Sequence, residues 1–212
     1  MRLTRAESKA ANKRALIEAA REIVGRDGSK AKLEDIAELA GLTTGAVYSL
    51  FGGKNGLLAA MVDDYAGPLD LRTAETAGAG RSGGCEGSGG RLEEAVAEVA
   101  RRFLRMSADP QAAGMLLFET RVLDLVLDDS DLRGRLNASI RSTEADLAAL
   151  FTGRHHDGGA VTGEQALRLA RALKALLSGL GQGVVLGAYE ADEGFFVQTA
   201  QALITPKVLG PA

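Results

Sequence analysis

The sequence predicts an all-α protein, and three observations support this fold class. Apolar residues recur at intervals of three and four over most of the chain. No stretch shows a sustained alternation of β-branched residues, so we expect no sheet. The four prolines all fall where a helical pattern stops, at Pro68, Pro110, Pro206 and Pro211. Together these patterns predict about nine helices in a chain of 212 residues.

Four of these helices lie in the amino-terminal third of the chain. The first carries apolar residues from Leu16 to Val24 and ends at Asp27 and Gly28. The second covers 33–40, the third 43–51, and the fourth runs from Lys54 to about Tyr65. The tight turn between the second and third helices contains Gly41. Two short helices joined in this way predict a helix-turn-helix.

The remainder divides into a glycine-rich segment and a helical body. Residues 67–90 hold little that could pack, which is typical of a flexible linker. Residues 78–83 match GxGxxG, but no strand precedes them, so we reject a dinucleotide site. Helical patterns then cover 92–106, 115–127, 132–151, 162–189 and 195–204. The 115–127 segment is apolar nearly all round, which predicts a helix buried among others.

The third helix lies in an uncharged stretch, although a quarter of the chain is charged. Residues 39–53 contain no Asp, Glu, Lys or Arg. In a helix-turn-helix the second helix enters the DNA major groove, so its outer face favours small or hydrogen-bonding side chains. Such side chains predict base contacts or close approach at Thr43, Thr44, Gly45, Ala46, Tyr48 and Ser49. Lys54, which follows the helix, is expected to reach a phosphate.

The segment "LEDIAELAGLTTGAVYSLFGGKNGLLAAM" resembles the signature of the tetracycline-repressor (TetR) family of transcription regulators. "ALIEAAREIVGRDG" is similar to the first helix of that family, so the resemblance covers residues 12–62. Three positions depart from the pattern. Leu50 cannot bond a phosphate, Lys32 can neutralise a phosphate but cannot cap the second helix, and Asn55 replaces a frequent Glu.

The resemblance implies a helix-turn-helix DNA-binding domain over 1–53 and a larger ligand-binding and dimerisation domain over 54–212. It also implies a homodimer that binds a pseudo-palindromic operator, most simply a repressor that a small molecule releases. The residues ahead of the motif favour this function, because the basic residues among them suit an arm that follows phosphates or the minor groove: Arg2, Arg5, Lys9, Lys13 and Arg14.

Gly179, Gly183 and Gly187 recur at every fourth residue of the 162–189 segment. Glycine inside a helix costs about 1 kcal/mol relative to alanine, so a gain such as close helix packing must offset it. We therefore expect these glycines at the dimer interface. The alternative is a helix that breaks near Gly179–Gly183.

A pocket for a largely apolar effector is expected among the residues Phe103, Met106, Met115, Phe118, Glu119 and Val122. For each apolar residue, an ordinary place in the core is an equal alternative. Glu119 lies on an apolar stripe, where a carboxylate is costly unless paired. It therefore either meets an internal donor or faces a ligand.

Composition and charge narrow the function classes. Residues 1–54 hold ten Lys and Arg against seven Asp and Glu, a balance of +3 on a chain of net charge −3. We see no signal peptide and no membrane span, and the single Cys85 favours a reducing cytoplasm.

His155 and His156 have no further His nearby for a metal site, and no nucleophile with its base is recognisable. We expect no cofactor and no enzymatic activity. The alternatives are a small-molecule-binding enzyme or carrier, or a protein-binding adaptor, with a purely structural amino-terminal hairpin.

Overall fold

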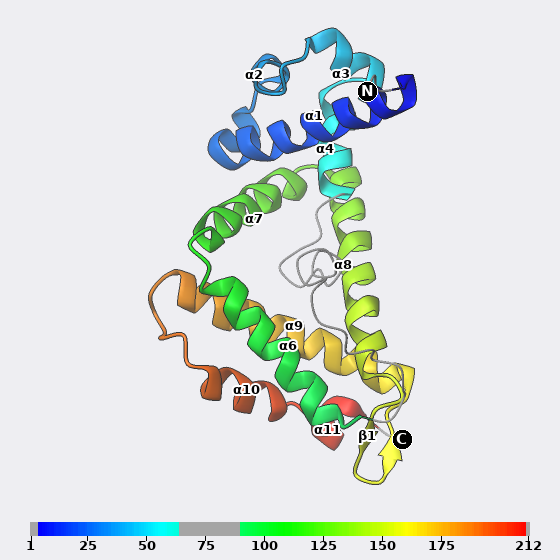
Figure 1. Cartoon of the computed structure of the whole chain (residues 1–212), viewed down its shortest axis with the longest axis vertical. Helices are drawn as coiled ribbons and strands as arrows, with labels where there is room; N and C mark the ends of the chain where they lie inside the picture. The colour runs from blue at the N-terminus through cyan, green and yellow to red at the C-terminus, as the bar shows by residue number, and fades with distance from the viewer. Residues whose placement is uncertain (1–3, 64–89, 211–212) are drawn as a thin grey trace. The chain divides into compact units, whose positions relative to one another are not determined.

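The computed structural model describes residues 4–63 and 90–210, which form ten α-helices, one 3₁₀ turn and a short β-hairpin (Figure 1). The predicted all-α fold is confirmed. The chain divides into two compact units, Met1–Tyr65 with Gly114–Ser139 (unit 1) and Ala66–Ala113 with Ile140–Ala212 (unit 2). This division differs from the expected boundary at residue 53, because unit 1 also contains a later segment. The glycine-rich 67–90 segment lies, except for Gly90, outside the described residues.

Unit 1 begins with the predicted four helices, which are α1 (Arg5–Asp27), α2 (Leu33–Leu39), α3 (Thr44–Phe51) and α4 (Lys54–Asp63). The 3₁₀ turn η1 (Gly28–Lys30) joins α1 to α2. The four helices share an apolar core that includes Leu16, Ile23, Ile36, Val47, Leu57 and Met61, all at most 3% exposed. The end of α1, both ends of α2 and α3 and the start of α4 are confirmed to within one residue. The start of α1 was not predicted, and the chain is not described directly beyond Asp63.

Arg5, Lys9, Lys13 and Arg14 do not form an extended arm. They belong to α1, whose start is fixed by a capping box in which Thr4 Oγ1 accepts from the Glu7 amide and Glu7 accepts from the Thr4 amide. The expected arm is therefore helical from Arg5 onward, because the cap in "TRAE" begins α1 there. Its contact with phosphates stays a prediction. Residues 1–3 lie outside the described range.

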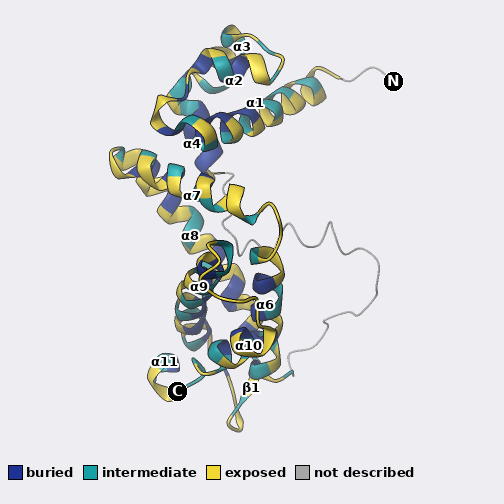
Figure 2. Cartoon of the chain, turned by 90° about the vertical axis from the view of Figure 1, so that its left-hand side faces the viewer, coloured by how far each residue is buried: buried dark blue, intermediate teal, exposed yellow. Residues whose placement is uncertain are grey.

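Unit 1 also contains α7 (Ala112–Leu127) from Gly114 and the part of α8 (Ser130–Phe151) up to Ser139. The end of α1 contacts α7 at Gly28, where a Cβ atom would lie 3.2 Å from Cδ of Arg121. Gly28 has φ 59°, which favours glycine on its own. Contrary to the prediction, α7 is not buried all round. Only Phe118, Val122 and Val126 of this helix are buried, while Leu123 and Leu127 are 53% and 67% exposed. Figure 2 shows both buried and exposed residues along α7.

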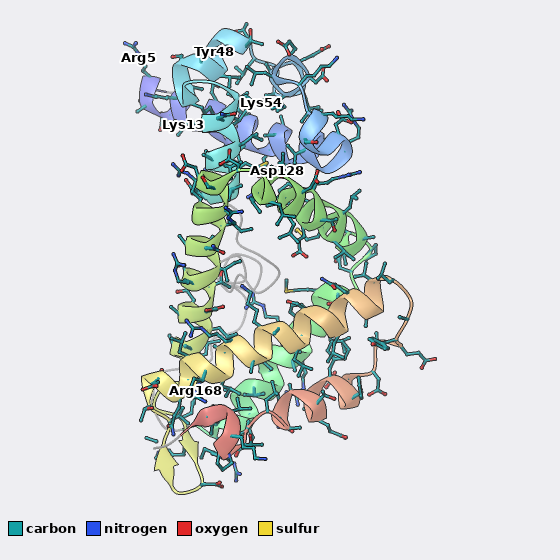
Figure 3. The ribbon with its side chains drawn as sticks, turned by 180° about the vertical axis from the view of Figure 1, so that it is seen from behind. Arg5, Lys13, Tyr48, Lys54, Asp128 and Arg168 are labelled. Carbon is teal, nitrogen blue, oxygen red and sulfur yellow. The ribbon has the colours of Figure 1, made fainter. Side chains whose placement is uncertain are left out.

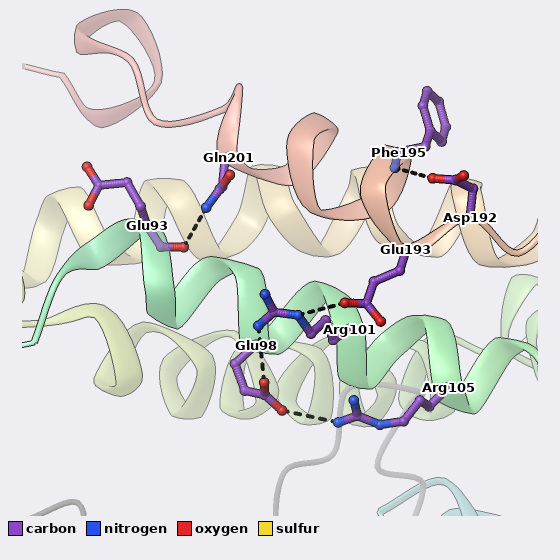
Figure 4. Close-up of polar contacts among 8 residues, drawn as sticks. All are labelled: Glu93, Glu98, Arg101, Arg105, Asp192, Glu193, Phe195 and Gln201. Carbon is purple, nitrogen blue, oxygen red and sulfur yellow. Dashed lines mark hydrogen bonds and ion pairs between the residues drawn. The ribbon is translucent and has the colours of Figure 1, made fainter.

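Unit 2 contains α6 (Leu92–Ser107), the remainder of α8, α9 (Gly163–Val185), α10 (Glu193–Gln201) and α11 (Pro206–Leu209). Its core includes Leu92, Val96, Phe151, Leu173, Leu177 and Phe196, all fully buried. Helix α10 lies along α6, and polar contacts tie the two together (Figure 4). Arg101 Nε donates to Glu193 Oε1 at 3.0 Å, and Gln201 Nε2 donates to the Glu93 carbonyl at 3.0 Å.

A two-stranded hairpin contradicts the expectation of no sheet. Strand β1 (His155–His156) pairs antiparallel with β2 (Gly159–Ala160). Asp157 and Gly158 form the turn with φ 46° and 81°. Asp-Gly is a strong hairpin signal, and it was overlooked because the expectation of no sheet rested on the lack of long alternating stretches. His156 Nδ1 lies 2.8 Å from Glu93 Oε1 and so ties the hairpin to α6. Burial raises the pKa of Glu93, but hydrogen bonds from its own backbone, from His156 and from Arg91 outweigh burial and lower it overall.

Helix α9 begins with the predicted capping box of Thr162 and Gln165, but it ends at Val185 and not near Tyr189. It runs unbroken through Gly179, Gly181 and Gly183. Gly187 lies beyond the helix with φ 70°, so the expectation that it shares a helical face with Gly179 and Gly183 is wrong. It instead follows the last helical turn in the left-handed conformation that commonly ends helices.

The three glycines in the second half of α9, at 179, 181 and 183, differ in their surroundings. A Cβ at Gly181 would lie 2.5 Å from the Phe103 ring, and a Cβ at Gly183 would lie 2.0 Å from the Tyr189 ring. Both are therefore explained by packing within the chain. A Cβ at Gly179 would have no neighbour within 4 Å among the described residues.

None of the helices in residues 4–63 and 90–210 combines the length and apolar character that a membrane crossing demands.

Candidate nucleic-acid interface

The turn between α2 and α3 has the tight form that a helix-turn-helix requires. The Leu42 amide donates to the Ala37 carbonyl and the Gly41 amide to the Glu38 carbonyl, both at 2.9 Å. These bonds satisfy the free carbonyls at the end of α2. Gly41 has φ 67°, a conformation that side-chain-bearing residues rarely adopt. The turn thus holds α3 at a fixed position against α2.

Helix α3 buries one residue completely, half-buries four others and exposes Gly45, Tyr48 and Ser49. Val47 is fully buried, whereas Tyr48 is 61% exposed. Of the other residues predicted to contact DNA, Thr43, Gly45 and Ser49 are exposed and Thr44 and Ala46 are half-buried. All six therefore lie on or beside the outer face of the predicted recognition helix, and none carries a charge.

Thr43 has a structural role that the sequence analysis missed. Its Oγ1 accepts a hydrogen bond from the Ala46 amide at 3.3 Å and caps the start of α3. A threonine directly before a helix is the usual signal for such a cap, so this role was recognisable. The hydroxyl proton remains available as a donor.

The end of α3 holds the Tyr48 ring in place. Gly52 ends the helix with φ 78°, and Gly53 follows with φ 137°. A Cβ at Gly53 would lie 3.4 Å from Tyr48 Cε1, so the ring rests against the backbone of this turn. Tyr48 is consequently exposed yet supported on one side, as a side chain that contacts base edges should be.

Lys54 also makes a hydrogen bond that joins two helix starts. Its ammonium donates to the backbone carbonyl of Ala31, the residue before Lys32, and so links the start of α4 to the approach of α2. Because the partner lies 23 residues earlier in the chain, no local sequence signal revealed this bond. Lys32 is exposed and makes no capping hydrogen bond to α2, as expected from its side chain.

Two further contacts fix α3 from behind. A Cβ at Gly56 would lie 1.9 Å from the Phe51 carbonyl oxygen, so α4 approaches the end of α3 with its bare backbone. Lys13 of α1 places Nζ 5.7 Å from the centroid of the Phe51 ring, within the range of a cation–π interaction. The recognition helix is therefore held by α1, α2 and α4.

The residues predicted for a ligand pocket are divided between the two units. Phe103 and Met106 lie on α6 in unit 2, and the other four lie on α7 in unit 1. Phe103, Phe118 and Val122 are buried, whereas Met106 and Met115 are 36% and 53% exposed. Glu119 is half-buried and takes part in an interaction within the chain, so the alternative of an internal partner gains support.

No arrangement of three or more His, Cys, Asp or Glu side chains in the described part of the chain is suited to bind a metal ion.

The comparison with protein families matches residues 16–61 to the model described as bacterial regulatory proteins, tetR family. These residues run from the core of α1 to α4 and include the whole helix-turn-helix. No curated protein sequence matches the chain.

Solved structures similar to this chain share its fold over nearly the full length. A TetR-family member from Streptomyces coelicolor A3 has a TM-score of 0.63 and 20% identity, and the match covers 92% of this chain and 98% of that one. The fatty acid degradation regulator FadR of Bacillus halodurans has a TM-score of 0.58 and 17% identity, with 94% and 95% covered. The multidrug binding protein EbrR, solved with imidazole, has a TM-score of 0.60 and 20% identity, with 94% and 96% covered. At these identities the likeness shows the fold.

Proposed function

We propose that this chain, whose residues 16–61 match the tetR family of bacterial regulatory proteins, is a DNA-binding transcription regulator of that family. It binds a pseudo-palindromic operator as a homodimer, acts as a repressor, and is released by a small molecule. The observation that carries the proposal is the uncharged, outward face of α3 on a rigid support. Members of this family are regulators rather than enzymes.

The side chains of this face have distinct roles in the proposed complex. Thr44, Tyr48 and Ser49 offer hydroxyl groups to base edges, and Gly45 and Ala46 let the helix approach the groove floor. Lys32 and Lys54 lie at the starts of α2 and α4, where they would contact phosphates. Lys54 keeps two of its three ammonium protons for this purpose after its bond to Ala31.

Binding to a duplex selected from a random-sequence pool tests this assignment. Tyr48→Ala is expected to change which sequences are preferred, because Tyr48 contacts bases, and to leave stability unchanged, because its ring is exposed. Lys32→Ala is expected to weaken binding to all sequences and lower the salt slope by about one for each protomer of the dimer. Fluorescence anisotropy across a salt series measures both effects. A parent protein that selects no sequence from the pool would overturn the proposed function.

The proposed dimer uses the outward side of α9. Gly179 lies there with no neighbour within 4 Å in the described chain, yet glycine in a helix costs about 1 kcal/mol relative to alanine. Ala172 and Leu176 lie on the same side at helical spacing and are half-buried. A second copy packed closely on this side would offset the cost of Gly179. Two recognition helices of such a dimer would read half-sites about 34 Å apart or a multiple of this.

The proposed effector contacts α7. This helix exposes Met115, Leu123 and Leu127, which are apolar and together favour an apolar small molecule. The fold is shared with EbrR, which is described as a multidrug binding protein and was also solved with proflavin. Since α7 belongs to the same compact unit as α1–α4, a ligand bound against α7 acts directly on the unit that contains α3.

For an effector found by screening, the factor by which it weakens DNA binding should equal the factor by which DNA weakens effector binding. A coupling of ~1–3 kcal/mol would weaken DNA binding roughly 5- to 150-fold, and operator DNA would weaken effector binding by the same factor. Met115→Ala is expected to raise the effector concentration needed for release while leaving DNA affinity without effector unchanged. Thr120→Ala, on a polar exposed position of the same helix, is the matched control. If Met115→Ala and Leu123→Ala both respond like the parent, the effector does not contact α7.

A further inference from the structure

The first half of α1 extends beyond the core of unit 1. All five buried residues of α1 lie between Leu16 and Val24, and none from Arg5 to Ala15 is buried. Figures 1 and 2 both show this end of α1 projecting past α3. We refer to residues 5–13 as the α1 overhang.

The overhang carries three cations on one face of α1. Farther along the helix, the same face packs against the core of unit 1. Arg5, Lys9 and Lys13 are spaced by four residues and therefore share one face. At 100° per residue, the same face continues into Leu16, Ala20 and Ile23, which are buried against the other helices of the unit. The cations therefore occupy, beyond the end of the core, the same face of α1 that core residues occupy farther along the helix. They are available to a partner that binds beside α3.

No carboxylate in the described ranges satisfies these three charges. Arg5, Lys9 and Lys13 are exposed and take part in no ion pair within residues 4–63 and 90–210. Glu7 is the acidic residue of the overhang, and it accepts from the Thr4 amide, a bond that lowers its pKa. Arg5 is also the first residue of the helix, where the macrodipole disfavours a cation. A negatively charged partner outside the chain would offset this.

The overhang is continuous with the recognition helix. Lys13 Nζ lies over the ring of Phe51, the last residue of α3. Figure 3 places Arg5, Lys13 and Tyr48 at the same end of the unit. The three cations therefore extend the face that bears Tyr48 along α1.

We propose that the α1 overhang binds the phosphate backbone beside the major groove that α3 enters. The inference rests on the proposed DNA binding and adds a second contact surface to it. From Arg5 to Lys13 the helix rises about 12 Å, which corresponds to three or four nucleotide steps of one strand at about 3.4 Å each. The Thr4 capping box and the alanines at 6, 10 and 11 keep this segment helical without core packing, so the charges are in place before DNA arrives.

The test compares three single variants of the full chain on one selected duplex. Arg5→Gln and Lys9→Gln each remove a charge from the stripe, and Arg14→Gln removes one from the opposite side of the same helix. We expect each stripe variant to lower the slope of log K against log salt by about 0.9 for each protomer, or about 1.8 for the dimer, uniformly for matched and mismatched duplexes. Arg14→Gln should leave the slope unchanged. Lys9→Glu should weaken binding further than Lys9→Gln, and circular dichroism should show unchanged helix content in all variants.

The outcomes separate this inference from the function on which it rests. If the parent selects an operator but the stripe variants keep its slope, the overhang does not contact DNA and the inference alone fails. The same holds if Arg14→Gln lowers the slope as much as Lys9→Gln, because the effect is then one of net charge. If the parent selects no duplex, the proposed function fails and the inference with it.

Discussion

Gly56→Ala is expected to destabilise unit 1 strongly and to abolish operator binding. The added methyl group would have to occupy the position of the Phe51 carbonyl oxygen, 1.9 Å away. A backbone atom cannot rotate aside, so α3 and α4 must separate, which also shifts Tyr48 and Lys54 on either side of the turn. Overpacking of this kind costs about 1–3 kcal/mol and sometimes more. Chemical denaturation followed by circular dichroism measures the loss of stability, and anisotropy with the selected duplex measures binding.

Gly134→Ala is the matched control for this change. Gly134 lies inside α8. Among the described residues, a methyl group added there meets no atom within 4 Å, so the same chemical change should stabilise the protein by up to about 1 kcal/mol through helix propensity, with DNA affinity retained. Equal stability and operator affinity in Gly56→Ala and the parent would contradict the close approach of α3 and α4.

Gly179→Leu is expected to convert the proposed dimer into a folded monomer. Within the chain the leucine has room, so helix content and the stability of the monomer should be retained. In the dimer, a branched side chain would stand where a second copy packs. A monomer reads one half-site, so affinity should fall toward the non-specific level, a loss on the order of 10³-fold or more. Light scattering measures the mass, and titration with the selected duplex measures the affinity.

Gly134→Leu and Gly183→Ala are the controls for the Gly179→Leu experiment. The first adds the same side chain at an open helical glycine away from α9 and should leave the mass and affinity unchanged. The second forces the Tyr189 ring away within one chain, so it should lower stability whether or not a dimer forms. A Gly179→Leu protein with the parent's mass in solution would exclude this side of α9 from the interface.

Local sequence signals were sufficient for most of the fold. The apolar spacing around Leu16 and Ile23, the Gly41 turn and the Thr162 capping box each act within about one turn of the chain, and each predicted its element. The Thr4 cap and the Asp157-Gly158 turn were equally local and were overlooked, so the start of α1 at Arg5 and the hairpin were not predicted. The end of α9 was misplaced because apolar residues continue past Val185 at helical spacing, and only the Tyr189 contact with Gly183 shows that the chain turns back.

The sequence predicted the features of the candidate site that depend on which face of α3 is exposed. It did not predict contacts between residues that are distant in the chain. The outer face of α3 followed from composition, because an uncharged run in a charged chain is conspicuous. The bond from Lys54 to Ala31 and the Lys13 contact with Phe51 join segments that are far apart in the sequence and that only folding brings together. For the same reason the spacing of Phe103 and Phe118 could not reveal that they belong to different compact units.

The burial of a single α3 side chain, that of Val47, has a consequence for how regulators of this kind diversify. Thr44, Tyr48 and Ser49 contribute little to the core, so they can be exchanged at small cost in folding free energy. Capping by Thr43, the Gly41 and Gly52 turns and the Lys54 bond hold the helix in place whichever side chains it displays. Target preference and foldability are thus encoded at different positions. A duplicated gene could acquire a new operator through a few substitutions on α3 without first acquiring stabilising changes elsewhere, and a library randomised at these three positions should remain mostly folded.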